Sequence, residues 1–134
     1  MSDEQIDWGA LKLAADAALP RAYAPYSSFR VGAAVLGADG RIFSAVNVEN
    51  ASYGLTVCAE RNAIASAIAA GCRRFRALSI VCSGQDPAAP CGACRQVIAE
   101  FPPIAAVRSY GCAGAQLEIG PEQLLPSAFR LERG

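Results

Sequence analysis

The N-terminal segment spaces its apolar residues like one face of a helix. Asp7, a residue type that favours the N-cap position, precedes the pattern, and Pro20, which a helix interior does not tolerate, follows it. The apolar positions are Trp8, Leu11, Ala15 and Leu19. This spacing predicts an amphipathic helix that begins after Asp7 and ends at Leu19.

A different pattern follows, in which apolar residues alternate with other residues along an extended segment. The alternating positions are Phe29, Val31, Ala33 and Val35. A turn-forming stretch at residues 37–40 then leads to a second segment of the same kind. Two such segments around a tight turn predict a β-hairpin over residues 29–48.

The rest of the chain alternates helix-like and strand-like stretches. Residues 58–71 are good helix formers with small apolar side chains on all sides, and Gly71 closes the stretch. The elements expected after it are a buried strand at Ala77–Cys82, a helix from Cys91 to about Phe101 stopped by Pro102 and Pro103, strands at 105–111 and 115–120, and a short helix from Pro121. Strands joined by helical crossovers predict an α/β fold, and we expect one domain over residues 1–134.

The charge balance of the chain narrows the possible partners. Twelve basic and twelve acidic side chains cancel, so no global field attracts polymeric nucleic acid or a membrane surface, and a small, roughly neutral molecule is the expected partner. The acidic N-terminus lacks the features of a signal peptide, and no apolar run is long enough to span a membrane. We therefore expect a soluble cytoplasmic protein whose six cysteines are thiols or metal ligands rather than disulfides.

Closely spaced cysteines are the main candidates for chemistry. Cys91 and Cys94 form a C-x-x-C pair, a spacing that lets two sulfurs bind one zinc ion but that also occurs in redox pairs and in protein cores. Cys58 and Glu60 lie at the start of one predicted helix, as the C-x-x-C pair lies at the start of the next. Helix N-termini stabilise anionic groups, so this placement favours a cluster of thiolates around a metal ion.

The number of ligands separates two kinds of zinc site. The chain contains no histidine, so these cysteines supply only three obvious ligands. Either one of Cys72, Cys82 and Cys112 completes a closed structural site, or the fourth position is open to water. An open position beside a carboxylate such as Glu60 is what hydrolytic zinc chemistry needs, because the metal acidifies the water and the carboxylate accepts its proton.

Four motifs resemble those of a known family. The sequences CAER (58–61) and PCGACRQ (90–96), with FRVGAAV (29–35) and NVEN (47–50) before them, closely resemble the small homotetrameric cytidine deaminases from about Tyr23 to Phe129. The resemblance implies a three-layer α/β/α fold with a mixed five-stranded sheet. It also implies zinc-dependent hydrolytic deamination of cytidine and deoxycytidine in cytoplasmic pyrimidine salvage, with one zinc ion per subunit of a homotetramer.

The resemblance assigns roles to the residues around the metal. Cys58, Cys91 and Cys94 would bind zinc. Glu60 would carry protons from water to ring nitrogen N3 and then to the departing ammonia. Arg61 would donate hydrogen bonds to the ligand sulfurs and draw charge from them, which offsets the weaker Lewis acidity of a zinc ion with three thiolates.

Other matched positions would contact the nucleoside. Asn47 and Glu49 would bind ribose hydroxyls, and Phe29 would pack on the pyrimidine ring, although a phenylalanine at the start of an alternating strand also fits a core position. The remaining matched positions are Ala59, and Ala51, Tyr53 and Phe129, of which the last three would complete a neighbouring subunit's site. The small apolar residues around the 58–71 helix also favour contact with both the sheet and another subunit.

Two other interpretations remain open at this level. A deaminase resembling blasticidin S deaminase shares the C-x-E and P-C-x-x-C motifs, but NVEN, with both Asn47 and Glu49, favours a nucleoside substrate. A non-catalytic, zinc-stabilised binding module is a different class of protein. It would need a fourth protein ligand and would have no use for Glu60.

The other cysteines and one helix residue have no assigned role. Cys72, Cys82 and Cys112 match no ligand position of the family, so we expect them to be small buried side chains. Asn62 stands where the resemblance leads us to expect threonine. We assign no change of function to it from the sequence.

Overall fold

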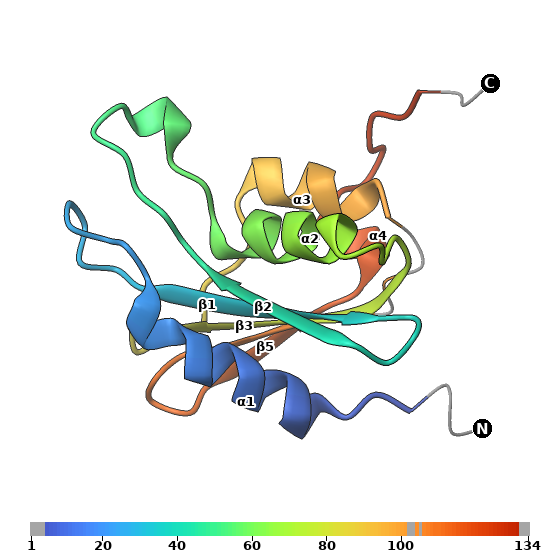
Figure 1. Cartoon of the computed structure of the whole chain (residues 1–134), viewed down its shortest axis with the longest axis horizontal. Coiled ribbons are helices and arrows are strands. Elements are labelled where there is room, and N and C mark those ends of the chain that lie inside the picture. The colour runs from blue at the N-terminus through green and yellow to red at the C-terminus, as the bar shows by residue number, and fades with distance from the viewer. Residues whose placement is uncertain (1–4, 102–103, 105, 132–134) are drawn as a thin grey trace.

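Three layers make up the structure, a computed structural model that describes residues 5–101, 104 and 106–131 (Figure 1). A five-stranded sheet lies in the middle. Helix α1 (Trp8–Ala18) covers one face of the sheet, and α2 (Ala59–Ala69), α3 (Gly92–Ala99) and the short α4 (Pro121–Leu124) cover the other. The predicted α/β/α fold with a mixed sheet is confirmed. None of the described helices is long and apolar enough to cross a membrane.

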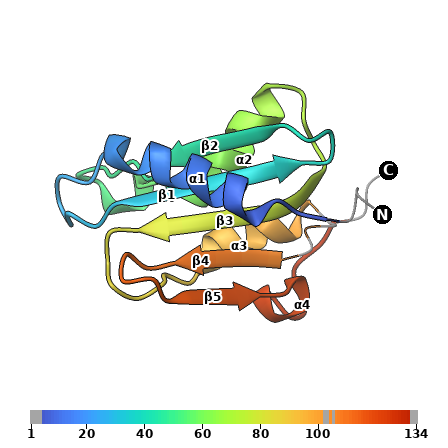
Figure 2. The ribbon, with the colours of Figure 1, turned by 90° about the horizontal axis from the view of Figure 1, so that it is seen from below.

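The sheet has the strand order β2-β1-β3-β4-β5, which Figure 2 shows from the side of α1. The strands are β1 Val31–Gly37, β2 Ile42–Val46, β3 Phe75–Cys82, β4 Ala106–Tyr110 and β5 Gln116–Ile119. Strands β3 and β4 run parallel because α3 carries the chain back between them, whereas the other three neighbouring pairs are antiparallel. The predicted hairpin is the β1–β2 pair, and its second strand forms one edge of the sheet.

Helix α1 begins where the sequence predicts it. The Asp7 carboxylate accepts a hydrogen bond from the backbone N–H of Ala10 at 3.0 Å, which satisfies one of the free donors of the first turn. Leu11 and Ala15 are fully buried. The α-helix ends one residue before the predicted end, and a 3-10 turn at Leu19–Arg21 continues it, since proline fits the first turn of a helical segment.

Strand β1 departs from the alternating pattern because both of its faces are covered. All residues from Gly32 to Gly37 are buried. Ala34 and Leu36 belong to the core beneath α1, whereas Ala33 and Val35 belong to the core beneath α2 and α3. The strand therefore has two buried faces, and the sequence pattern predicted one of them.

The second half of the chain follows the predicted elements with small shifts. Gly71 has a φ of +92° just after α2, a left-handed conformation that suits glycine at a helix end. Strand β3 begins at Phe75, two residues earlier than predicted, and α3 ends at Ala99, two residues earlier than predicted. The prolines expected to stop α3, and the predicted start of the next strand at position 105, lie outside the described residues.

All six cysteines are free thiols. Cys72 and Cys82 are buried, as expected, with 5% and 2% of their surface exposed. Cys112 is exposed, so the prediction that it is buried is wrong. It lies in the turn between β4 and β5, where its backbone N–H donates to the Gly84 carbonyl at 2.8 Å while the residue itself stays accessible to solvent.

Candidate active site

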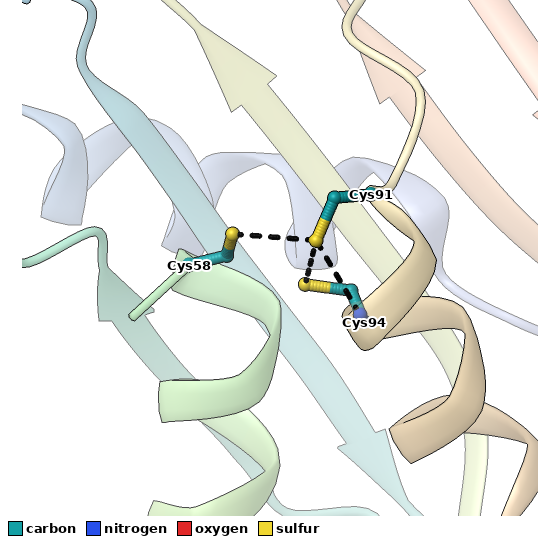
Figure 3. Close-up of side chains that lie close together, drawn as sticks. All are labelled: Cys58, Cys91 and Cys94. Atoms are coloured by element: carbon teal, nitrogen blue, oxygen red, sulfur yellow. Dashed lines mark hydrogen bonds between the residues drawn. The ribbon is translucent and has the colours of Figure 1, made fainter. Parts of the chain in front are cut away.

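The three predicted zinc ligands meet at the N-termini of two helices. Cys58 is the N-cap residue of α2, Cys91 is the N-cap residue of α3, and Cys94 lies in the first turn of α3. Figure 3 shows the three sulfur atoms pointing toward one another. Both helices lie on the same face of the sheet (Figure 1), so the partial positive charge of two N-termini lies next to the sulfurs.

The spacing of the sulfurs fits one metal ion. Sγ of Cys91 lies 3.6 Å from Sγ of Cys58 and 3.4 Å from Sγ of Cys94, and all three atoms lie within 4.8 Å of one another. Thiolates bound to a tetrahedral zinc ion at about 2.3 Å are about 3.8 Å apart. Within the described part of the chain, no fourth histidine, cysteine, aspartate or glutamate joins this group. The cluster can therefore bind zinc with one coordination position left open.

Arg61 lies beside the cluster. Its Nη2 atom is 3.8 Å from Sγ of Cys58 and 3.4 Å from the Thr56 carbonyl oxygen, and its buried Nε has no hydrogen-bond partner among the described residues. Hydrogen bonds from Cys94 and Arg61 lower the pKa of Cys58 to about 5. The contact with Cys58 raises the pKa of Cys94, because that thiol keeps the shared proton. The arrangement favours thiolate at Cys58, which is the form that binds metal.

Glu60 is buried in the first turn of α2, two residues after Cys58, and is 5% exposed. Burial, together with the negative charge of Cys58, raises the pKa of its carboxyl group to about 7. A carboxyl group that titrates near neutrality can both accept and donate a proton at physiological pH. Glu60 is not part of the group of possible metal ligands, so its carboxylate stays available for proton transfer.

Asn47 holds the segment that carries Phe29. Its Oδ1 accepts a hydrogen bond from the N–H of Val31 at 3.0 Å, and its Nδ2 donates to the Phe29 carbonyl at 2.9 Å. Asn47 is 8% exposed, whereas Phe29 is 39% exposed and therefore accessible to a ligand. The ring of Phe29 lies against Gly84, where an added Cβ would come within 3.0 Å of it. An asparagine amide has one further N–H and one further lone pair, so Asn47 can brace Phe29 and still bind a ligand.

Glu49 lies in a cavity of about 340 Å³, whose lining residues are Tyr26, Ser27, Glu49, Asn50, Tyr53 and Thr56. Its carboxylate accepts hydrogen bonds from the hydroxyl and the N–H of Ser27 and from the N–H of Tyr26. The Ser27 hydroxyl is the main cause that lowers the pKa of Glu49. The cavity has the size of a small-molecule site, and a fixed carboxylate in it is a strong acceptor for hydroxyl groups.

The remaining predicted contact residues divide into one buried and three exposed residues. Ala59, the first residue of α2, is fully buried. Ala51 is exposed, and Tyr53 and Phe129 are 81% and 67% exposed. The backbone carbonyl of Phe129 nevertheless accepts a hydrogen bond from Nε2 of Gln96 at 3.0 Å. This contact ties the C-terminal segment to α3 and leaves the aromatic side chain accessible to another molecule.

Two residues that support the site were not predicted. Ser27, which holds Glu49, lies in a polar loop, and no sequence signal distinguishes it from its neighbours. Arg95 donates hydrogen bonds to the carbonyls of Pro90 at 2.8 Å and Leu124 at 2.9 Å, which joins the residue before Cys91 to α4. Its position directly after the C-x-x-C motif was the signal that could have indicated a role near the metal.

Three thiols with an open fourth position define a metal centre of the zinc-binding class. A family model described as the cytidine and deoxycytidylate deaminase zinc-binding region matches residues 7–109. The chain belongs to this family, and the cysteine cluster is its site for one zinc ion per chain.

Similarity to known proteins extends over most of the chain. It is 54% identical to a cytidine deaminase of Sporosarcina psychrophila over 81 residues, which are 60% of each protein. It is 49% identical to a cytidine deaminase of Halalkalibacterium halodurans over 112 residues, which are 83% of this chain and 85% of the relative. The crystal structure of cytidine deaminase from Burkholderia pseudomallei is 48% identical, with a TM-score of 0.86 over 92% of this chain and 100% of that chain. The likeness to the Burkholderia pseudomallei structure therefore includes the fold of nearly the whole chain.

Proposed function

We propose that this protein is a zinc-dependent hydrolase that converts cytidine and deoxycytidine to uridine and deoxyuridine, with release of ammonia, in pyrimidine salvage. The observation that carries the proposal is the cluster of three thiols, which offers an open metal position close to the buried Glu60. The names of the relatives support the substrate class. A non-catalytic zinc module would need a fourth ligand, and the described residues supply none.

The chemistry divides between the metal and Glu60. Cys58, Cys91 and Cys94 would hold the zinc ion, which would supply Lewis acidity that makes water nucleophilic at neutral pH. Glu60 accepts a proton from the attacking water and delivers it to ring nitrogen N3, which makes C4 electrophilic. Glu60 then takes the second proton of that water and passes it to the amine on C4. The C4–N bond breaks, ammonia leaves, and the water oxygen remains as the uracil carbonyl.

Residues of the β1–β2 side orient the nucleoside in this proposal. Glu49, held by the loop at Tyr26 and Ser27, accepts hydrogen bonds from ribose hydroxyls. Asn47 uses its remaining amide groups on the same ribose, and Phe29 packs on the pyrimidine ring. The fixed carboxylate of Glu49 in its cavity favours a substrate whose sugar carries free hydroxyl groups.

Assembly and location form a second part of the proposal. Ala51, Tyr53 and Phe129 complete the site of a neighbouring chain in a cytoplasmic homotetramer. The high exposure of both aromatic side chains supports this arrangement, because large apolar groups that face solvent commonly mark contact surfaces. Small apolar residues on the outer side of α2 also remain exposed, namely Ala65 and Ala69.

Turnover of a nucleoside panel tests the proposed activity. Zinc-loaded protein should convert cytidine and deoxycytidine, followed by the change in pyrimidine absorbance, and should leave blasticidin S unchanged. Protein with one zinc ion per chain that converts neither nucleoside would refute the proposal. Rapid conversion of blasticidin S would instead support the rival substrate.

The Glu60→Gln variant tests the proton-transfer role. Glutamine has nearly the same volume but cannot accept the proton, so we expect full zinc content and a kcat lower by about a hundred- to ten-thousand-fold. Glu118→Gln, which changes an exposed residue of β5 paired with Arg108, is the matched control and should leave kcat unchanged. If Glu60→Gln with full zinc keeps the wild-type kcat, another group carries the protons.

A further inference from the structure

The side chain of Asn62 joins the metal-binding helix to the edge of the sheet. Its Nδ2 donates a hydrogen bond to the Val46 carbonyl at 2.8 Å. Asn62 lies two residues after Glu60 in α2, and Val46 is the last residue of β2, directly before Asn47. One half-buried side chain therefore connects the helix of the reacting centre with the segment that leads to the NVEN motif.

The Val46 carbonyl is free for this bond because of the register of the hairpin. Asn47 donates its backbone N–H to the Val31 carbonyl, so the neighbouring backbone groups of Val46 point away from β1. Strand β2 is the edge of the sheet, and among the described residues no further strand lies beyond it to pair with those groups. An edge carbonyl of this kind is left to water unless a side chain binds it.

A second connection joins the NVEN motif to the segment that precedes α2, and it consists of backbone hydrogen bonds. Val48 and Val57 exchange two hydrogen bonds of 2.9 Å each, which fastens the middle of the NVEN motif to the residue before Cys58. Backbone bonds of this kind form with any side chain except proline. Of these two connections, only the bond from the Asn62 side chain depends on the type of residue. At this position the chain has asparagine where the resemblance leads us to expect threonine.

We propose that Asn62 is a positioning residue, which sets the distance between the proton-transfer centre on α2 and the residues at the end of β2 that hold the nucleoside. This inference rests on the proposed function. The backbone N–H of Asn62 donates to the Cys58 carbonyl at 3.2 Å as part of the helix, a bond that any residue except proline would make. Its side chain acts through Val46 on Asn47, which braces Phe29, and on Glu49. A displacement of these groups relative to Glu60 lowers the rate because reaction requires close alignment of substrate and catalytic group.

Asn62→Ala removes the donor without harming the helix, since alanine is the best helix former. We expect kcat/KM for cytidine to fall about three- to tenfold, because substrate and Glu60 lose alignment. Zinc content should stay that of the wild type, and the melting temperature should fall by only a few degrees, the effect of one lost hydrogen bond. Ser66→Ala, an exposed position one turn further along α2, is the matched control and should change neither quantity. An unchanged kcat/KM in Asn62→Ala would overturn the proposal.

A double-mutant cycle with Glu49→Gln separates positioning from general support of the fold. If Asn62 acts through the ribose-binding segment, its replacement should cost less in the Glu49→Gln background than in the wild type. Equal losses in both backgrounds would overturn the proposal.

Amide hydrogen exchange gives a readout that does not need turnover. Residues 46–49 should exchange faster in Asn62→Ala than in Ser66→Ala, and equal exchange would refute the connection. This measurement distinguishes the two ideas: wild-type protein without deaminase activity would refute the proposed function, while the exchange data would still decide the role of Asn62.

Discussion

Replacement of Gly32 by alanine should loosen α1 from the sheet. An added Cβ would lie 2.5 Å from the Ala15 carbonyl oxygen, which is backbone and cannot rotate away, and 3.3 Å from the Leu19 nitrogen. Helix α1 would have to move by roughly one ångström to restore ordinary contact. Overpacking of this kind costs about 1–3 kcal/mol. Because Leu11 and Ala15 on the inner face of this helix are fully buried, we expect a loss near the upper end, about 2–3 kcal/mol of the free energy of unfolding.

Thermal unfolding of zinc-loaded protein measures this effect. For a chain of this length, a loss of about 2 kcal/mol corresponds to a melting temperature lower by roughly 10 °C or less. Zinc content and turnover at 25 °C should stay near wild-type values, because α1 and the cysteine cluster lie on opposite faces of the sheet. Gly9→Ala, which changes a glycine within α1 itself, is the matched control.

The control should change stability in the opposite direction. An added Cβ at Gly9 would meet only Oδ1 of Asp7, at an ordinary 3.5 Å, and glycine in a helix costs up to about 1 kcal/mol relative to alanine. Gly9→Ala should therefore melt at or above the wild-type temperature. If Gly32→Ala also melts with the wild type, the close approach of α1 to β1 does not limit stability, and the packing argument fails.

Two further predictions concern the metal and the assembly. Cys91→Ala and Cys94→Ala should each lower zinc content toward zero and destabilise the fold, whereas Cys112→Ser at the exposed turn should keep one zinc ion per chain; full zinc in the first two variants would mean that the ligand set is wrong. If the proposed tetramer forms, dilution followed by light scattering and activity should show that turnover falls as it dissociates, before zinc is lost. A fully active monomer would require withdrawal of the roles of Tyr53 and Phe129.

Local signals predicted the elements of the fold well, because each rests on a few neighbouring residues. Asp7 caps α1 as its side chain suggests, and Gly71 follows α2 in the conformation that glycine favours. The strand order could not be read from the same signals, since pairing of β1 with β3 joins segments far apart in the chain. The double-sided burial of β1 followed from that order, and it is why its alternating pattern indicated only one of its two buried faces.

The candidate site was predictable where a motif carries chemistry in its own spacing. The C-x-x-C pair and the C-x-E motif indicated the metal ligands, because sulfur spacing within one helical turn limits what the residues can bind. The partners of Glu49 and Asn62 were not predictable, since Ser27 and Val46 reach them only through the fold. Cys112 was predicted wrongly because cysteine is usually buried, and nothing in the residue type reports an exposed turn.

The zinc site also acts as a cross-link within the chain. Cys58 and Cys91 are 33 residues apart, and the segment between them contains β3, the central strand of the sheet. An ion bound by both cysteines closes a loop that contains this strand. A covalent link that closes a loop of this length lowers the entropy of the unfolded chain, which stabilises the folded state by about 4 kcal/mol. The metal thus stabilises the fold by a cross-link, as a disulfide does in a protein of an oxidising compartment. Unlike a disulfide, this cross-link can be opened by a chelator and requires that its sulfurs remain reduced.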